Sequence, residues 1–269
     1  MFADFPLWLL PIEMQEHVRN VERRKALAIK VALESTPIQK WTPDLKWAPF
    51  LQIDGDSYEY SPLFDVPPCD LMDRDPSKWV RSGTWGYRNV TLPKGESMRT
   101  CLGTKPGHVC FTTDIVIPAL WQHGPERVWM SHTPFEALSQ RPGIKKARGR
   151  VLVGGLGMGW ALRQLAMRPN VTQLAVVERD SSLLDWFGLD LVQKICHESN
   201  RKIEVIADDA YAAADRGFKD FDSFVFDIWP YYGSARTDYK WQVLSQRAKE
   251  ARKVAWAWGA SGAPRRDDD

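Results

Sequence analysis

A glycine-rich segment, residues 151–159 (VLVGGLGMG), holds the groups best suited to bind a ligand through the backbone. A β-branched apolar run enters it, and a helical pattern with apolar residues on one face follows from Trp160 to Met167. The pattern predicts a strand, a tight turn and a helix N-terminus. Glycine permits a sharp turn with positive φ and lets a ligand approach bare peptide groups, and the first helical turn offers unpaired N–H donors. The segment therefore predicts a site for a nucleotide-like cofactor.

Carboxylates follow the predicted strands that come after this segment. Glu178 ends the first of them, Asp208 and Asp209 end the second, and Asp227 ends the third. In an open parallel sheet, ligands bind outside the carboxyl ends of the strands, near the point where the strand order reverses. One acid at such a position can be a helix cap. Acids at three successive strand ends predict a polar crevice beside the glycine turn.

The spacing of the glycines distinguishes between cofactors. A dinucleotide fingerprint, G-x-G-x-x-G, that starts at Gly155 would end on Trp160 instead of a glycine, which weakens the dehydrogenase interpretation. Read as G-x-G-x-G over Gly155, Gly157 and Gly159, with an acid ending the next strand, the region resembles the S-adenosylmethionine site of the class I methyltransferases.

The resemblance implies a role for each matching position. In that family the glycine loop lies against the methionine part and the ribose, the acid ending the second strand accepts hydrogen bonds from both ribose hydroxyls, and the acid after the third strand faces the adenine amine. A carboxylate suits a diol because it can accept two donors at once. The cofactor-binding residues implied by position are Gly155, Leu156, Gly157, Met158, Gly159, Glu178, Asp208, Asp209, Ala210 and Asp227.

Guanidinoacetate methyltransferases and related arginine methyltransferases resemble the chain more closely, in the segments 133–135 (TPF), 155–158 (GLGM), 221–222 (FD) and 226–230 (FDIWP). This resemblance implies that Asp227 orients the attacking nitrogen and takes up its proton. It also implies an acceptor pocket, to which we assign Glu136, Trp229, Tyr231 and Tyr232. Those enzymes carry a glutamate where this chain has Val153, so a guanidinium substrate is not carried over.

Polyamine aminopropyltransferases, the spermidine synthase-like group, are similar in having β-hairpins before the same fold and in Asp209-Ala210 after the third strand. Gly157 or Met158 stands where their loop carries an aspartate, and Pro230 stands where their second acid would be. The sequence thus favours a methyltransferase, with N-methylation of a small molecule or a protein side chain as the expected reaction. Aminopropyl transfer from decarboxylated S-adenosylmethionine is the alternative, and a cofactor-binding module without turnover is a third hypothesis.

The elements that must position this site predict an α/β fold. Strand and helix patterns alternate over residues 127–258, which indicates crossover units and a parallel sheet. The resemblance implies the Rossmann-like three-layer sandwich of the class I methyltransferases. The fifth predicted strand, Val254 to Trp258, lacks the antiparallel hairpin that usually follows it, so we expect the N-terminal segment or a second copy in a homodimer to cover its edge. Residues 259–269 form a polar tail that we expect to be disordered.

Residues 1–126 show a different pattern. Ile12 to Glu34 predicts an amphipathic helix, and the proline-rich stretch 36–76 predicts an extended segment that wraps the core or forms a lid. Apolar runs predict two antiparallel hairpins, one with its turn at Pro93 to Glu96 and one over residues 108–131. Thr133, Pro134 and Glu136 then form an N-terminal capping set for a helix that we expect to end near Arg141, before Pro142-Gly143.

Composition limits the partners. The 269 residues carry 36 basic and 34 acidic side chains and a net charge of +2, which gives no indication of a nucleic-acid partner. No apolar run approaches the roughly 20 residues of a membrane span. The four cysteines include no C-x-x-C pair, and Cys101, His108 and Cys110 have only Cys69 as a possible fourth ligand, so no metal site is predicted. We expect a soluble cytoplasmic protein with reduced thiols.

Overall fold

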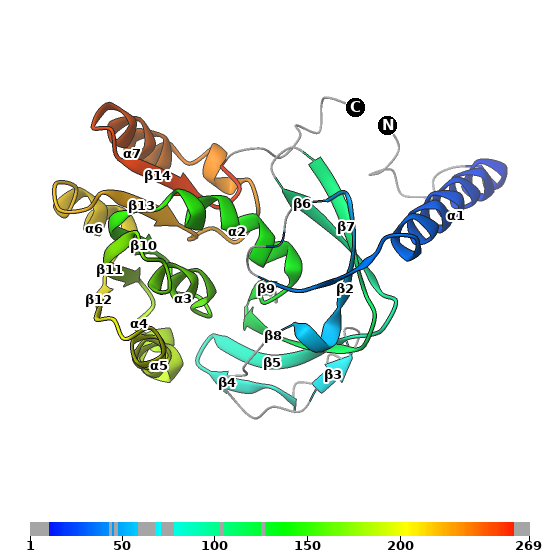
Figure 1. The fold of residues 1–269 in the computed structure, drawn as a ribbon, viewed down its shortest axis with the longest axis horizontal. Coiled ribbons are helices and arrows are strands. Elements are labelled where there is room, and N and C mark those ends of the chain that lie inside the picture. Colours follow the sequence, from blue (N-terminus) through cyan, green and yellow to red (C-terminus); the bar gives the residue numbers. More distant parts are fainter. Residues whose placement is uncertain are drawn as a thin grey trace.

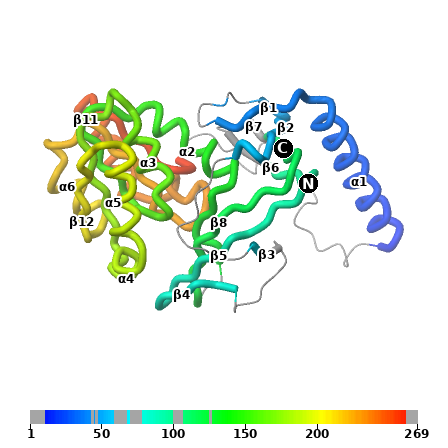
Figure 2. Tube along the Cα trace, turned by 60° about the horizontal axis from the view of Figure 1, so that its bottom comes forward, coloured from blue at the N-terminus to red at the C-terminus, as the bar shows by residue number. Residues whose placement is uncertain are grey.

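The structure is a computed structural model of the chain, and it describes residues 11–42, 45, 48–58, 68–70, 78–102, 105–124 and 127–260. A β-rich N-terminal part lies beside a C-terminal part in which helices enclose a parallel sheet (Figure 1). The long helix α1 (Ile12–Glu34) has the predicted bounds and lies at the far end of the N-terminal part from that sheet (Figure 2). None of the helices in the described part combines the length and the apolar composition that a bilayer crossing requires.

Five parallel strands form the C-terminal sheet, as the alternating pattern predicted. Their order across the sheet is β12 (Ile203–Ala207), β11 (Val171–Glu178), β10 (Gly149–Gly154), β13 (Ser223–Phe226) and β14 (Val254–Ala257). Because β11 lies on one side of β10 and β13 on the other, the strand order reverses at β10. The glycine turn therefore leaves the sheet at its topological switch point.

Helices cover both faces of this sheet. Alternate residues of β10 point to opposite faces, so Val151 and Val153 belong to one core and Leu152 to the other. The first core contains side chains of α2 (Pro134–Lys146), α3 (Trp160–Ala166), α4 (Ser181–Leu183), a π-helical turn (Leu184–Gly188) and α5 (Leu189–Ser199). The second contains side chains of α6 (Ala210–Arg216) and α7 (Tyr239–Glu250). The C-terminal part is thus a layered α/β structure with a parallel sheet, compatible with a Rossmann-like fold.

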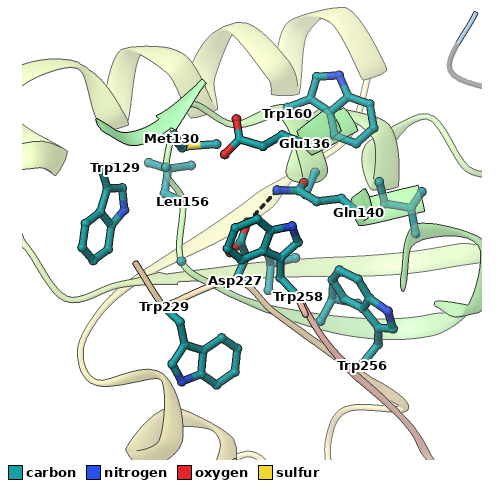
Figure 3. Close-up of a pocket in the computed structure, with 16 residues that line it drawn as sticks. Trp129, Met130, Glu136, Gln140, Leu156, Trp160, Asp227, Trp229, Trp256 and Trp258 are labelled. Carbon is teal, nitrogen blue, oxygen red and sulfur yellow. Dashed lines mark hydrogen bonds between the residues drawn. The ribbon is translucent and has the colours of Figure 1, made fainter. Parts of the chain in front are cut away.

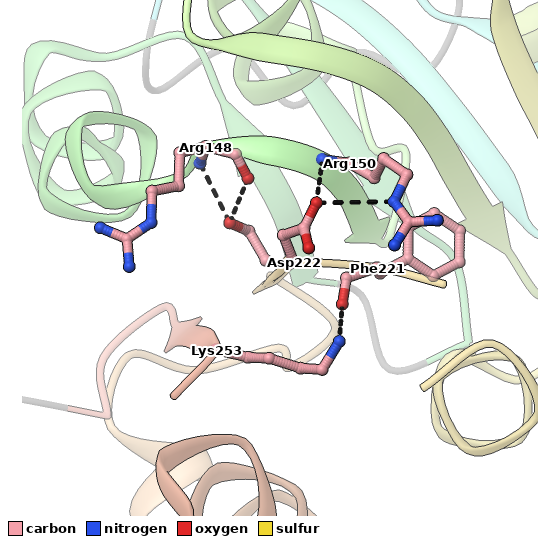
Figure 4. A network of polar contacts seen from close by, with 6 residues as sticks. Arg148, Arg150, Phe221, Asp222 and Lys253 are labelled. Atoms are coloured by element: carbon pink, nitrogen blue, oxygen red, sulfur yellow. Dashed lines mark hydrogen bonds and ion pairs between the residues drawn. The ribbon is translucent and has the colours of Figure 1, made fainter. Parts of the chain in front are cut away.

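A polar network joins the amino ends of β10 and β13 (Figure 4). The Arg150 amide donates to Asp222 Oδ2 at 2.9 Å, and Ser223 Oγ both accepts from the Arg148 amide and donates to the Arg148 carbonyl. Lys253 Nζ donates to the Phe221 carbonyl. Asp222, part of the FD segment that resembles the guanidinoacetate methyltransferases, therefore stabilises strand pairing at the amino ends of the strands. The strand-end acids lie at the opposite, carboxyl ends.

The outer edge of β14 has no strand partner among the described residues, because β14 pairs only with β13 there. None of the described strands of the N-terminal segment supplies the cover that we expected, since they belong to other sheets. Helix α2 instead packs against the face of the strand, where Trp256 lies over Gly143. Cover of the edge by a second copy of the chain stays a prediction.

Two further sheets form the N-terminal part. One has the order β1 (Ile38–Lys40), β2 (Phe50–Asp54), β7 (Lys105–Phe111) and β6 (Ser97–Leu102). The other has the order β3 (Pro68–Asp70), β5 (Trp85–Leu92), β8 (Ile115–Gln122) and β9 (Arg127–Ser131), with β4 (Val80–Ser82) paired to β5. Residues 43–44, 46–47, 59–67 and 71–76 of the proline-rich stretch lie outside the described part, as do residue 77 and residues 261–269 of the predicted tail.

The first predicted hairpin is wrong in its pairing, whereas the second is confirmed in part, since β8 pairs antiparallel with β9. β5 pairs with β8 over eight residues, and β6 pairs with β7, so the turn at Pro93 to Glu96 joins strands of two different sheets. The predicted run 108–117 divides into β7 and β8 at residues 112–114. Two hydrogen bonds join the turn between β5 and β6 to the connection between β7 and β8. The Lys94 amide donates to Asp114, and the Gly95 amide donates to the Phe111 carbonyl. β9 pairs with β8, so this strand belongs to the N-terminal sheet although we had placed it in the 127–258 unit.

Helix α2 also departs from the prediction, because it continues through Pro142 to Lys146. Thr133 caps it as expected, accepting from the Glu136 amide at 3.4 Å. A Cβ on Gly143 would lie 2.3 Å from the Trp256 ring, so the small residue lets the helix pack directly onto β14. This tertiary contact outweighs the backbone hydrogen bond that Pro142 removes.

Candidate functional site

The glycine turn is confirmed, and its left-handed backbone is one that residues with a Cβ rarely adopt. Gly155, Gly157 and Gly159 have φ values of +88°, +50° and +77°. A Cβ would lie 2.3 Å from the Asp227 carbonyl oxygen at Gly155 and 2.2 Å from Met130 Sδ at Gly157. The turn therefore needs glycine both for its left-handed backbone and for its close approach to neighbouring residues.

We predict that Gly155→Ala lowers the free energy of unfolding by at least about 2 kcal/mol, because left-handed strain and overpacking contribute about 1–3 kcal/mol each. Gly95→Ala is the matched control: Gly95 has a φ of +79°, but no atom lies within 4 Å of its added Cβ. Urea denaturation of both variants separates the clash from the strain. Equal losses of stability would contradict the close approach at Gly155.

A crevice of about 380 Å³ opens at the carboxyl ends of β10, β11, β12 and β13. It brings together most of the predicted cofactor residues: Gly155, Gly157, Glu178, Asp208, Asp209, Ala210 and Asp227. Leu156, Met158 and Gly159 do not line it. Leu156 lines a second cavity described below, the Met158 side chain is in the core, and Gly159 packs against Leu191. We call this space the cofactor crevice.

Glu178 connects the glycine turn to the end of β11. Its Oε2 accepts from the Leu156 amide and its Oε1 from the Asp180 amide, both at 3.0 Å. Each carboxylate oxygen has a further lone pair, so the group can accept two more donors from a ligand. The predicted ribose acceptor thus also holds the turn in place.

The acids after β12 have different local roles. Asp209 caps α6, because its Oδ1 accepts from the amides of Tyr211 and Ala212 at 3.0 and 3.1 Å. Asp208 pairs with Arg216, whose guanidinium holds the pKa of that carboxyl below its usual range. Asp209 Oδ2 makes none of the capping bonds and is the oxygen that a ligand amine could reach.

The N-terminal sheet supplies a wall of the crevice that the sequence did not indicate. Trp85, Gln122 and Trp129 line it. Trp85 Nε1 donates to Asp180 Oδ2 at 2.8 Å, across 95 positions of the chain. Since this contact depends on how the two parts dock, no local pattern could have revealed it.

A second, smaller cavity of about 30 Å³ lies beneath α2 (Figure 3). Glu136, Gln140 and Asp227 supply its polar side chains. Its aromatic lining residues are tryptophans, namely Trp129, Trp160, Trp229, Trp256 and Trp258. We call this space the tryptophan cavity. It shares Gly155, Gly157, Trp129 and Asp227 with the cofactor crevice, so the two spaces adjoin at the glycine turn.

The polar side chains of the tryptophan cavity come from one face of α2 and from the end of β13. Glu136 and Gln140 are four residues apart and so lie on the same helix face. Gln140 Nε2 donates to Asp227 Oδ2 at 2.5 Å, while Glu136 Oε2 accepts from the amide and the hydroxyl of Ser131. Gln140 was not predicted as a site residue, although it falls within the predicted helix and its spacing from Glu136 would have placed it on the same face.

Burial shifts both carboxyls of this cavity toward the neutral form. It raises the pKa of Glu136 to about 8, with a further contribution from the neighbouring Asp227, and the pKa of Asp227 to about 7. Both acids are half-buried by surface area, so each keeps a face toward the cavity. The pair can therefore exchange protons near neutral pH.

The predicted acceptor residues divide into two groups. Glu136 and Trp229 line the tryptophan cavity with Asp227, and Trp229 is held by a 2.8 Å hydrogen bond from its Nε1 to Asp238. Tyr231 and Tyr232 do not line it: Tyr231 is 63% exposed, and Tyr232 packs against Trp258 and Phe135.

Comparison with known protein families and with curated proteins finds no matching family model and no curated relative.

Proposed function

We propose that the chain is an S-adenosylmethionine-dependent methyltransferase of the class I type, transferring a methyl group to nitrogen in a small molecule or a protein side chain. The observation that carries the proposal is a single crevice, at the switch point of a parallel sheet, that holds the glycine turn and the acids of three successive strand ends. An adjoining cavity shares Asp227 and offers room for an acceptor.

The residues of the crevice fit this cofactor. The bare peptide groups of Gly155 and Gly157 would border its methionine part, Glu178 would accept from the ribose hydroxyls, and Asp209 would face the adenine amine. When bound, the cofactor supplies an electrophilic methyl group on a positively charged sulfur. No covalent intermediate on the protein is needed for such a displacement.

The side chains of the tryptophan cavity would prepare the acceptor. Gln140 holds Asp227 Oδ2, which leaves Oδ1 to orient the acceptor nitrogen and to take up its proton. A pKa of about 7 leaves a large fraction of Asp227 ionised at neutral pH, as a general base requires. The tryptophan walls exclude water, which strengthens these polar contacts.

Aminopropyl transfer is a second candidate, and the charge of the two cavities favours it. The described lining residues include six acids, Glu136, Glu178, Asp180, Asp208, Asp209 and Asp227, and a single cation, Arg179. The α-carboxylate of S-adenosylmethionine would find few positive partners there, whereas the decarboxylated cofactor carries only an ammonium group at that end. Supplying each cofactor in turn with the same amine distinguishes the two reactions by the group added to the product.

Calorimetric titration with S-adenosylhomocysteine tests the cofactor assignment. We predict binding by the wild-type chain and an affinity at least about tenfold lower for Glu178→Ala, because a hydrogen bond to a charged group contributes about 1.5–3 kcal/mol. Glu204→Ala is the matched control, since Glu204 lies on β12 outside both cavities. Absence of binding by the wild type, or undiminished binding by Glu178→Ala, would contradict the assignment.

A further inference from the structure

We propose that the tryptophan cavity binds the terminal primary ammonium group of an unbranched aliphatic chain, and that it selects this group over alcohols and over guanidinium groups. The inference deepens the function proposed above, since it names the class of acceptor for the same site. A small diamine and a lysine side chain both carry this group.

The polar side chains of the cavity offer more hydrogen-bond acceptors than donors, so they favour a ligand with several donors. Gln140 is 2% exposed, its Nε2 is used by Asp227, and its Oε1 has no hydrogen-bond partner among the described residues. Leaving a buried acceptor unpaired costs about 1–3 kcal/mol. Glu136 and Asp227 add two carboxyls that face the same space. An ammonium group brings three donors and no acceptor, so it can satisfy all three side chains, whereas an alcohol brings one donor.

The charge of the cavity points to a cation. The described residues that line it include two carboxyls and no Lys, Arg or His. Burial disfavours the ionised form of both acids, and a bound cation would reverse this effect because an opposite charge favours ionisation. The tryptophan faces also attract a cation that comes within about 6 Å of a ring centre.

The size and wall of the cavity discriminate between cations. Its volume of about 30 Å³ exceeds the roughly 10–15 Å³ that one water needs, so it admits an ammonium nitrogen with its first carbon. A guanidinium group is planar, has three nitrogens and prefers a two-pronged acceptor. Val153 lines the cavity and is 2% exposed, so one part of the wall offers no acceptor.

Calorimetric titration of the full chain, without cofactor, tests the inference with four probes: n-butylamine, n-butylguanidine, 1-butanol and a short peptide with one central lysine. We predict that butylamine binds at least tenfold more tightly than butylguanidine or butanol. At pH 7, repeating the titration in buffers of different ionisation enthalpy should show proton release, because the ammonium draws Glu136 and Asp227 into their ionised forms. The peptide distinguishes the sources, since binding by the peptide indicates a protein acceptor and binding by butylamine alone indicates a small molecule.

Two variants locate the binding. Gln140→Met keeps the length of the side chain but removes the acceptor, so it should lower the affinity for butylamine at least tenfold. Gln140→Glu keeps an acceptor and should keep butylamine binding. Gln164→Met on α3 is the matched control, because Gln164 lies outside both cavities. Equal affinity for butanol and butylamine, tighter binding of butylguanidine, or no amine binding by a chain that still binds S-adenosylhomocysteine would overturn the inference. The last result would leave the cofactor assignment intact.

Discussion

Replacing Asp227 with asparagine is expected to slow transfer by about 10²–10⁴-fold, the usual contribution of a positioned general base. Asparagine keeps the shape of the side chain and an acceptor for Gln140, but it cannot take up a proton. Asp227 lies where the two cavities meet, so its loss should affect the reaction more than the binding of S-adenosylhomocysteine. Initial rates measured with the acceptor amine, beside calorimetric affinities for S-adenosylhomocysteine, separate the two effects.

The pH profile gives the same prediction a second readout. Because Asp227 must be deprotonated to act, kcat/KM of the wild type should rise with pH through about 7. That rise should be absent from the residual activity of Asp227→Asn. Asp215→Asn is the control: Asp215 pairs with Arg247 on the surface and should keep the wild-type rate and profile. Full activity of Asp227→Asn would remove the assigned base.

Replacing Glu136 with glutamine is expected to raise the free energy of unfolding at pH 8.5 by an amount on the order of 3 kcal/mol, and to leave it nearly unchanged at pH 4.5. The pKa of Glu136 is raised from 4.5 to about 8 in the folded chain, so the unfolded chain loses this proton first as the pH rises. The stabilisation from the neutral carboxyl is thus fully present below about pH 4.5 and is lost by about pH 8. Glutamine stays neutral and keeps an acceptor for Ser131.

Urea denaturation at the two pH values measures this effect. Glu204→Gln serves as the control, because Glu204 is exposed on β12 and should change stability little at either pH. A loss of stability at pH 8.5, or the same change at both pH values, would show that ionising the buried Glu136 does not destabilise the fold as expected. A gain in stability combined with weaker amine binding would indicate that the acid is retained for binding.

Local patterns were sufficient to predict the glycine turn and the acids around it. Gly155 and Gly157 indicate a turn because glycine adopts positive φ without strain. Glu178, Asp209 and Asp227 follow strands whose apolar runs are clear in the sequence. Parallel pairing then brings these strand ends to one edge without further information.

Long-range packing decided what the sequence could not show. The turn at Pro93 to Glu96 has the residues of a hairpin, yet β5 pairs with β8, because a longer apolar strand competes for it. Pro142 looked like a helix end, but the contact of Gly143 with Trp256 carries α2 onward. Trp85 reaches the crevice from a different sheet, through a contact that no spacing along the chain encodes.

The most direct test of the account supplies methyl-labelled S-adenosylmethionine and a primary amine to the wild-type chain, with Asp227→Asn and Asp215→Asn in parallel. We predict labelled N-methylated amine from the wild type and from Asp215→Asn, and a strong loss of this product with Asp227→Asn. No labelled product from a wild-type chain that binds S-adenosylhomocysteine would contradict methyl transfer to an amine.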